Sequence, residues 1–328
     1  MKRILVTGGA GYIGSILVRQ LLQKDYAVRV VDNLRFGGES LIELLEHPNF
    51  EFVKADIRDE AALEKVLADV WACVHLAAIV GDPACATEPE LARATNLTAS
   101  MRFYEQCEEA KLERFVFAST CSNYGKMPDP GGFVDESSPL KPVSLYAETK
   151  VAFEKFLLGQ DPDNHCKPTC LRFSTVYGLS PRIRFDLTVN EFAKELALGR
   201  ELVVFGEQFW RPYCHVRDLA RSAVMVLEAE ATKVAFDVFN VGASHENYQK
   251  QTIIKLIQKE LPEARIKFVH KNEDPRDYRV RFEKIRERLG FELSRTVPAG
   301  IREIINLVQE GFILNPDDPK YFNVPPKG

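Results

Sequence analysis

Tyr146 and Lys150 stand four positions apart, a spacing that places both side chains on one face of a helix. A tyrosine hydroxyl has a pKa of about 10 and is a poor base at neutral pH. An adjacent ammonium favours the phenolate, which can then take a proton from a substrate hydroxyl. On its own the pair could equally be a surface feature, so its interpretation depends on the residues around it.

Thr120 follows a short apolar run, Phe115–Ala118, in a segment rich in small polar residues, Ser119–Gly125. Side chains at the carboxyl ends of parallel strands face the crevice in which ligands bind. Thr120 could therefore hydrogen-bond a reacting oxygen and orient it toward Tyr146. A run of this kind is also typical of a turn, and the residues alone leave both interpretations open.

The segment Gly8–Gly14 has glycine at 8, 11 and 14, between an apolar run, Ile4–Thr7, and a helical pattern over Tyr12–Gln23. Glycines at these points permit a tight turn, a close approach to a pyrophosphate and close helix–strand packing, with the helix N-terminus facing the anion. The pattern indicates a dinucleotide site. The positive ring of an oxidised nicotinamide would further favour a Tyr146 phenolate.

Asp32 ends the next apolar run, Val28–Val31, and lies 18 residues beyond the last of these glycines. A carboxylate there can bind the adenosine ribose hydroxyls and would repel the additional phosphate of NADP. The predicted cofactor is therefore NAD, although Arg35 could pair with that phosphate and admit NADP. Asp56 and Ile57 are placed to contact the adenine ring, although a surface turn would explain these two residues almost as well.

The elements that must hold these residues alternate between strand-like and helix-like patterns up to about residue 180. This alternation predicts an α/β fold, a Rossmann-type doubly wound parallel sheet with helices on both faces. Besides the runs named above, the predicted elements are strands at Phe52–Val53, Cys73–Leu76 and Cys170–Phe173 and a helix at Ala61–Leu67.

After about residue 180, loops containing Arg and Pro interrupt this rhythm. We expect residues 1–179 to bind NAD and carry the catalytic residues, and 180–328 to form mainly a smaller α/β substrate-binding lobe, with an interleaved boundary. The lobe's predicted elements are strands at Leu202–Phe205 and Phe236–Val241 and helices at Asp218–Glu228 and Tyr248–Glu260. The proline-rich tail Asn315–Gly328 is expected to be irregular and to lie on the surface.

The 328 residues have an ordinary globular composition, 45% hydrophobic and 27% charged, with a net charge of −4. That charge gives no positive field for nucleic acid, and no apolar run approaches the roughly 18–20 residues that span a bilayer. Seven irregularly spaced cysteines and the lack of a signal-peptide pattern indicate a cytoplasmic protein with reduced thiols. His165, Cys166 and Cys170 could suggest zinc, but no second ligand pair appears, so no metal is predicted.

Together these features resemble the extended short-chain dehydrogenase/reductase family, in its nucleotide-sugar epimerase/dehydratase branch. The resemblance covers nearly the whole chain and is carried by Thr7–Gly14, Asp32, Asp56, His75–Ala78, Asn96, Ser119–Gly125, Tyr146–Lys150, Arg172–Gly178 and Arg211–Asp218. It implies Thr120, Tyr146 and Lys150 as the catalytic residues. It implies NAD bound by Gly8, Gly11, Tyr12, Ile13, Asp32, Asn33, Asp56, Ile57, Leu76, Ala77 and Ala78, together with Tyr146 and Lys150. Asn96 would support the strand behind the active site.

The resemblance also implies a nucleotide-diphosphate sugar as substrate. The residues expected to contact it are Val80, Cys121, Ser122, Ser174, Arg182, Arg184, Asn190, Arg211 and Arg276. Ser174 stands where many family members have asparagine, which leaves the nucleotide open. Each arginine could instead be a solvated or salt-bridged side chain, and Asn190 could meet either a phosphate or the base.

By this resemblance the chain is an NAD-dependent epimerase that oxidises the sugar transiently at C4 and returns the hydride to the other face. Alternatives are a net oxidoreductase on the same substrate class and an NAD-binding scaffold that has lost catalysis. The family's 4,6-dehydratases carry Asp-Glu directly after the catalytic threonine. Cys121 and Ser122 stand there instead, so dehydration is disfavoured.

The resemblance further implies a homodimer that pairs the helix of Tyr146 and Lys150 with the preceding helix, about Ala99–Ala110. The apolar residues available on the first of these helices are Val151, Phe153, Phe156 and Leu157. They could serve the core and an interface alike.

Overall fold

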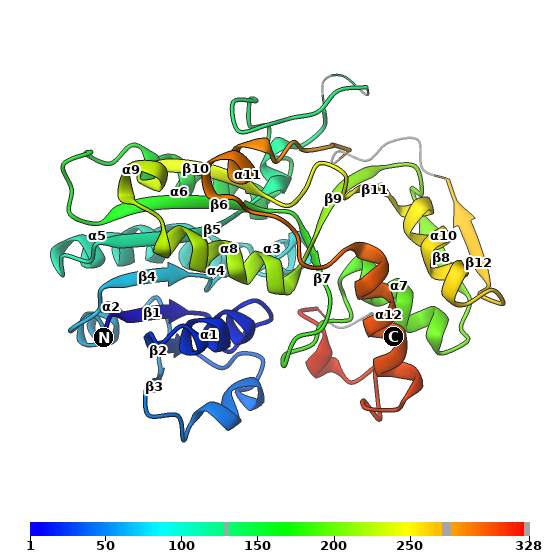
Figure 1. The fold of residues 1–328 in the computed structure, drawn as a ribbon, viewed down its shortest axis with the longest axis horizontal. Coiled ribbons are helices and arrows are strands. Elements are labelled where there is room, and N and C mark those ends of the chain that lie inside the picture. The colour runs from blue at the N-terminus through cyan, green and yellow to red at the C-terminus, as the bar shows by residue number, and fades with distance from the viewer. Residues whose placement is uncertain (128, 130, 271–276, 325–328) are drawn as a thin grey trace.

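A seven-stranded sheet in the order β10-β6-β5-β4-β1-β2-β3 forms the centre of the structure, a computed structural model that describes residues 1–127, 129, 131–270 and 277–324 (Figure 1). All neighbouring strands in it are parallel. The strands are β1 (Arg3–Thr7), β2 (Ala27–Asp32), β3 (Phe50–Lys54), β4 (Ala72–His75), β5 (Arg114–Thr120), β6 (Lys167–Phe173) and β10 (Asp237–Val241). The predicted doubly wound fold is confirmed.

The helical segments associated with this sheet lie on both of its faces (Figure 1). The α-helices are α1 (Gly14–Gln23), α2 (Glu60–Val66), α3 (Asp82–Thr87), α4 (Pro89–Arg93), α5 (Ser100–Glu109), α6 (Leu145–Leu158), α8 (Val216–Glu228), α9 (Ala231–Val234) and α11 (Glu283–Leu289). A π-helical segment, η2 (Ala94–Ala99), precedes α5, and short 3-10 segments lie at η1 (Glu39–Leu44) and η3 (Cys121–Tyr124).

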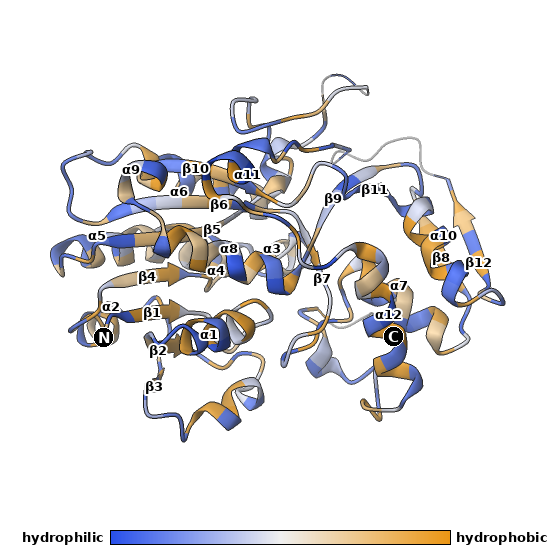
Figure 2. Ribbon diagram, viewed as in Figure 1, coloured by the Kyte–Doolittle hydropathy of each residue, from blue (hydrophilic) through white to orange (hydrophobic). Residues whose placement is uncertain are grey.

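Alternate residues of the strands supply the two faces of the core. Ile4 and Val6 of β1 belong to a buried cluster that includes the apolar residues of α1 and α8. Leu5, between them, belongs to a second cluster with apolar residues of α2, α5 and α6. Figure 2 colours much of β1 and β4 as hydrophobic, as expected of strands covered on both sides.

A smaller lobe lies beside the carboxyl ends of the central strands (Figure 1). It holds a three-stranded sheet, β11-β9-β7, and a parallel pair, β12-β8. Its elements are β7 (Thr175–Tyr177), α7 (Thr188–Ala197), β8 (Leu202–Phe205), β9 (Trp210–His215), β11 (Asn247–Gln249), α10 (Lys250–Glu260), β12 (Ile266–Val269), α12 (Val297–Gln309) and η4 (Pro319–Tyr321).

Three elements differ from the sequence prediction. The helix expected in the smaller lobe at 218–228 is α8, which packs against α1 and the large sheet. The strand expected in the smaller lobe at 236–241 is β10, which pairs in parallel with β6 and so joins the large sheet. The helix expected to begin at Tyr248 begins at Lys250, because Tyr248 pairs with Arg211 of β9 in an antiparallel ladder. Residues after 180 thus contribute to the large sheet as well as to the smaller lobe, and the division at 179/180 stays a prediction.

The described part of the tail is irregular apart from η4 and most of its residues are at least partly exposed, but its end packs against the lobe. Phe322 is buried, and Asn323 and Val324 are half-buried. The backbone N–H of Phe185 donates to the carbonyl of Tyr321 at 2.9 Å. Side-chain burial therefore holds this segment against the lobe despite its prolines.

Apolar residues of α6 pack inside the chain. Val151, Phe153 and Leu157 are buried, and Phe156 lies edge-on to Tyr104 with ring centroids 5.9 Å apart. All seven cysteines are buried and none is joined in a disulfide. None of the helices in the described ranges is both long and apolar enough to cross a membrane.

Candidate active site

A cavity opens at the carboxyl ends of β1, β2, β4 and β5, where the strand order reverses between β1 and β4. Every residue expected to be catalytic or to bind the cofactor lines it. These are Gly8, Gly11, Tyr12, Ile13, Asp32, Asn33, Asp56, Ile57, Leu76, Ala77, Ala78, Thr120, Tyr146 and Lys150. Segments far apart in the sequence thus meet in one space.

The glycine turn between β1 and α1 has the shape of an anion cradle. Gly8 has a φ of +73°, and a Cβ there would lie 2.8 Å from the backbone nitrogen of Ala77. A Cβ on Gly14 would lie 2.2 Å from the Gly8 carbonyl oxygen, whereas one on Gly11 would meet only that oxygen, at 3.2 Å. No side chain caps the start of α1. The N–H groups of Ser15 and Ile16 donate to the carbonyls of Gly11 and Ile13, so a phosphate would be met by the N–H groups that precede them, at the very start of the helix.

The carboxylate of Asp32 is held at the end of β2 by two backbone donors. The N–H of Ala10 donates to Oδ2 at 3.0 Å and that of Leu34 to Oδ1 at 2.8 Å. Burial raises the pKa of Asp32, while these hydrogen bonds and the charge of Arg182 act in the opposite direction. Each carboxylate oxygen retains a lone pair for a ribose hydroxyl.

Asp56 lies beyond β3 among polar partners. Asn33 donates to its carboxylate at 2.9 Å, and Arg58 donates to both oxygens at 2.8 and 2.9 Å. These hydrogen bonds keep the pKa of Asp56 well below its ordinary value. Arg58, which the sequence analysis did not single out, also lines the cavity. The residues that line this end therefore fit the predicted dinucleotide.

Buried polar side chains support the loop after β4. The carboxamide of Asn96 accepts from the Ile79 N–H at 2.7 Å and donates to the Ile79 carbonyl at 2.9 Å. His75 is hydrogen-bonded between Thr7 and Ser100, and its burial lowers its pKa to about 3. His75 is therefore neutral at physiological pH, and its contacts are those of a structural residue.

Helix α6 brings the tyrosine and the lysine to the cavity. Ser144 caps the helix by accepting from the N–H of Ala147 at 3.3 Å, which places Tyr146 in the first turn. Lys150, one turn later, is 3% exposed and donates to the Ala118 carbonyl at 2.8 Å. Its Nζ lies 5.9 Å from the centroid of the Tyr146 ring.

The two groups titrate differently from exposed side chains. Burial raises the pKa of Tyr146; Cys85 and Asp82 add to this rise, and the charge of Arg184 opposes it. Burial lowers the pKa of Lys150 to about 8. In the protein without ligand the hydroxyl is therefore protonated, and Lys150 alone does not convert Tyr146 into a base.

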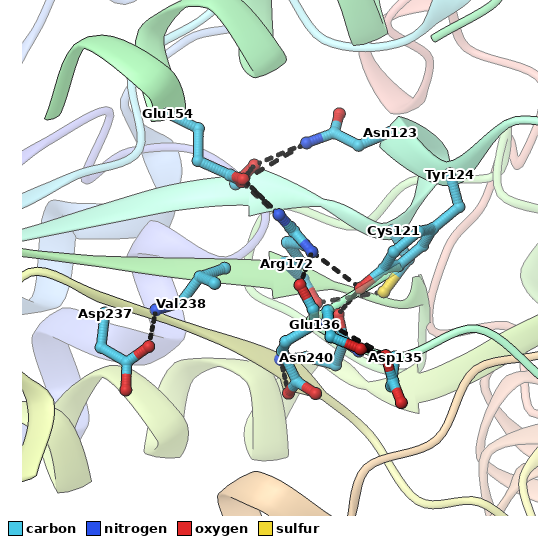
Figure 3. A network of polar contacts seen from close by, with 12 residues as sticks. Cys121, Asn123, Tyr124, Asp135, Glu136, Glu154, Arg172, Asp237, Val238 and Asn240 are labelled. Atoms are coloured by element: carbon cyan, nitrogen blue, oxygen red, sulfur yellow. Dashed lines mark hydrogen bonds and ion pairs between the residues drawn. The ribbon is translucent and has the colours of Figure 1, made fainter. Parts of the chain in front are cut away.

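Thr120 ends β5 and caps η3, its Oγ1 accepting from the Ser122 N–H at 3.1 Å. A buried polar network holds the strand behind it (Figure 3). Glu154 accepts from Ser119 at 2.8 Å and from Arg172 at 2.5 Å.

The guanidinium of Arg172 in turn donates to the Tyr124 hydroxyl at 2.8 Å, as Figure 3 shows. The Tyr124 hydroxyl donates to Asn240 of β10 at 2.7 Å. The network thus joins α6, β5, β6 and β10 directly behind the end of β5 that carries Thr120.

Four of the residues expected to contact substrate line the cavity: Val80, Ser174, Arg182 and Arg184. Arg182 lies over the ring of Phe36, its guanidinium carbon 4.4 Å from the centroid, and its buried Nε has no partner among the described residues. Arg184 pairs with Asp186 at 2.7 Å. A phosphate or a second carboxylate would suit these guanidinium groups.

The remaining expected contacts lie elsewhere. Cys121 is 1% exposed and its thiol donates to the Arg172 carbonyl. Asn190 donates to the carbonyl of Arg184 and accepts from the Gly178 N–H, so it holds the loop rather than lining the cavity. Ser122 and Arg211 also lie outside the lining, both near Tyr278. Arg276 lies outside the described residues.

Several lining residues were not predicted. They include Phe36, Arg58, Ile79, Leu91, Thr95, Phe173, Val176, Leu219 and Asn323, and Arg35, considered above as a partner of the NADP phosphate, lines the cavity as well. Phe36 and Arg58 lie close in sequence to Asp32 and Asp56, and this proximity is a signal that could have found them. Asn323 carries no such signal. Among the described residues, no three His, Cys, Asp or Glu side chains lie together as a metal site would require.

Comparisons with known proteins give the following similarities. The family model described as the NAD dependent epimerase/dehydratase family matches residues 4–242. A UDP-glucose 4-epimerase of Lactobacillus helveticus is 29% identical over 277 residues, which cover 78% of this chain and 81% of the relative. A dTDP-glucose 4,6-dehydratase of an Actinoplanes species is 32% identical over 318 residues, covering 92% and 96%. The crystal structure of UDP-glucuronic acid 4-epimerase from Bacillus cereus, with UDP-glucuronic acid and NAD, has a TM-score of 0.84 at 26% identity, covering 94% of this chain and 99% of that one.

Proposed function

Because the chain belongs to the NAD dependent epimerase/dehydratase family, we propose that it epimerises a nucleotide-diphosphate sugar at C4. It is an enzyme of the extended short-chain dehydrogenase/reductase type, and its cofactor is NAD. The observation that carries the proposal is that Thr120, Tyr146 and Lys150 line the same cavity as the glycine turn and Asp32. A proton-transfer group and a dinucleotide site thus share one space.

When bound, NAD supplies a hydride acceptor and donor beside the sugar. Tyr146 takes the proton of the C4 hydroxyl and later returns it to the epimeric oxygen, and Thr120 hydrogen-bonds that oxygen and orients it. Since burial raises the pKa of Tyr146, base catalysis requires positive charge nearby. The Lys150 ammonium supplies part of that charge at neutral pH, held in place by the Ala118 carbonyl.

The two positions after Thr120 support epimerisation over dehydration. Elimination of water from the sugar needs an acid and a base, roles that the Asp-Glu pair fills in the dehydratases. The thiol of Cys121 is buried against the Arg172 carbonyl, and its burial raises its pKa above its ordinary value. It is therefore a poor acid or base for a step inside the cavity, although a dehydratase is among the relatives.

The test is to incubate the protein with UDP-, GDP-, dTDP- and CDP-sugars plus NAD and to record the products by mass and by NMR. We expect an isomer of unchanged mass with no accumulation of NADH. Loss of two hydrogens with stoichiometric NADH would instead indicate a net oxidoreductase, and loss of water a dehydratase. Either result would overturn the proposal.

A Tyr146→Phe variant separates catalysis from cofactor binding alone. It should lower turnover at least about 100-fold, while the dissociation constant for NADH rises by no more than about 10-fold, the range for one lost hydrogen bond. Tyr26→Phe, in a tyrosine stacked on Trp71 away from the cavity, is the matched control and should retain full activity. Full activity in Tyr146→Phe would contradict the assignment of Tyr146.

A homodimer through α5 and α6 is part of the proposal, and so is a cytoplasmic location. Because Val151, Phe153 and Leu157 are buried within the chain, the exposed residues of these helices would have to form the interface. Light scattering of the purified protein measures the mass directly, and a monomer at micromolar concentration would contradict the dimer.

A further inference from the structure

The last described residues of the chain reach the cavity in which the chemistry is proposed. Asn323 lines it, together with residues of the glycine turn and of α6. The next residue, Val324, packs against a small buried cluster formed by Ile79, Ala84, Cys85 and Ala92, and Tyr146 packs against the same cluster. The segment also lies beyond residues 4–242, the part of the chain that carries the family features.

Two ion pairs fix the beginning of this segment on the smaller lobe. The carboxylate of Asp317 lies 2.9 Å from the ammonium of Lys194 and 2.5 Å from the guanidinium of Arg200. The ammonium of Lys194, on α7, is almost fully buried and also pairs with Glu195, whereas the Asp317 carboxylate remains partly exposed. Asp317 is thereby held at a defined place on the lobe.

Contacts with the loop after β7 fix the other end. The N–H of Asn323 donates to the Asp186 carboxylate at 3.4 Å, and the carbonyl of Phe322 accepts from Arg182 at 3.5 Å. Phe322 itself is buried, with the Lys194 ammonium 5.3 Å from its ring centroid. The backbone on both sides of the Asn323 side chain is therefore anchored, and the side chain is presented at a defined position.

The Asn323 carboxamide has the chemistry of a sugar-binding group. It offers two donors and an acceptor, which match the hydroxyl groups of a pyranose. In the described part of the chain its side chain makes no hydrogen bond, although its backbone does. Its neighbour Val324 packs on the same four-residue cluster as Tyr146, the residue expected to act at the reacting carbon, and this shared cluster puts Asn323 on the Tyr146 side of the cavity.

We propose that Asn323 is a substrate-binding residue that hydrogen-bonds the sugar, and that residues 317–324 form a wall that selects which sugars enter. The inference rests on the proposed function, since it takes the substrate to be a nucleotide-diphosphate sugar. It assigns the choice of sugar to a segment beyond residues 4–242, the part matched by the family model. The residues expected to bind the cofactor all precede residue 151.

The test compares Asn323→Ala with wild type, both loaded with NADH, by calorimetric titration. The ligands are UDP-, dTDP-, GDP- and CDP-glucose and the matching nucleoside diphosphates. The sugar nucleotide that wild type binds should bind Asn323→Ala about 3- to 10-fold more weakly, the range for one lost hydrogen bond. The nucleoside diphosphate and NADH should bind within about two-fold of wild type. Asn306→Ala, an exposed asparagine on α12, is the matched control and should change none of the three.

Equal binding of the sugar nucleotide to Asn323→Ala and wild type would overturn this inference and leave the proposed function standing. An equal loss of nucleoside diphosphate or NADH binding would overturn it too, because the residue would then face another part of the ligand. If wild type bound no sugar nucleotide in the panel, the proposed function would fail first, and the inference with it.

Discussion

The ionisation of Lys150 should make the folded protein more stable as the pH rises through the alkaline range. The side chain is 3% exposed, and burial lowers its pKa from 10.5 to about 8. Below about pH 8 the lysine is charged in both the folded and the unfolded protein, and the fold bears the cost of the buried ammonium. Between about pH 8 and 10.5 the unfolded chain binds more protons, so stability increases with pH.

The size of the effect follows from the difference between the two pKa values. At about 1.4 kcal/mol per pKa unit, a fall from 10.5 to about 8 corresponds to about 3 kcal/mol in the free energy of unfolding. The variant Lys150→Met has no group to titrate at this position. Its stability relative to wild type should therefore decrease by about 2–3 kcal/mol between about pH 7 and pH 10.

Urea unfolding of both proteins, followed by circular dichroism at several pH values, measures this difference. Buried thiols that do not interact with Lys150, such as Cys121, whose pKa burial raises, behave alike in both proteins and cancel in the comparison. Lys155→Met, on the exposed face of the same helix, is the matched control and should give a difference that does not vary with pH. A constant difference for Lys150→Met as well would refute the argument.

Two further predictions concern groups around the same site. Asp32→Ala should weaken NADH binding by about 10-fold or more, the range for a hydrogen bond to a charged group. It should also reduce the ratio by which the protein prefers NADH to NADPH. Fluorescence titration with both cofactors measures this ratio, and an unchanged ratio would contradict the role of Asp32. Glu154→Gln should lower the free energy of unfolding by about 3–5 kcal/mol, because it leaves the buried Arg172 without its counterion. The matched control is Glu105→Gln in the exposed ion pair with Arg102, which should lower the free energy of unfolding by urea by less than about 0.5 kcal/mol. Equal losses of stability in the two variants would show that burial of the Glu154–Arg172 pair is not the cause.

Local patterns were sufficient to predict the central sheet and the cofactor end of the cavity. The glycine turn, Asp32 and the Tyr146–Lys150 pair each depend on a strand end or a helical turn of a few residues, so their spacing in sequence determines their spacing in the fold. Alternation of strands and helices then predicts that these ends share one edge of a parallel sheet.

Contacts between distant segments could not be predicted in this way. The strand at 237–241 has the same apolar pattern whether it pairs with β6 or lies in the smaller lobe, and only the three-dimensional fold selects β6. Asn190 and Cys121 fit the family pattern, yet their side chains bind backbone carbonyls: Asn190 that of Arg184 in a loop, and Cys121 that of Arg172 in β6. The prolines near Asn323 indicate irregular backbone but not what that backbone covers.

The central claim is that hydride leaves C4 of the sugar and returns to the same carbon within one binding event. It is tested most directly with a nucleotide-sugar that the protein converts, carrying deuterium at C4. The account predicts an isomer that retains the deuterium at C4, with no accumulation of NADH during turnover. Loss of deuterium from the sugar, or NADH rising in step with product, would contradict it.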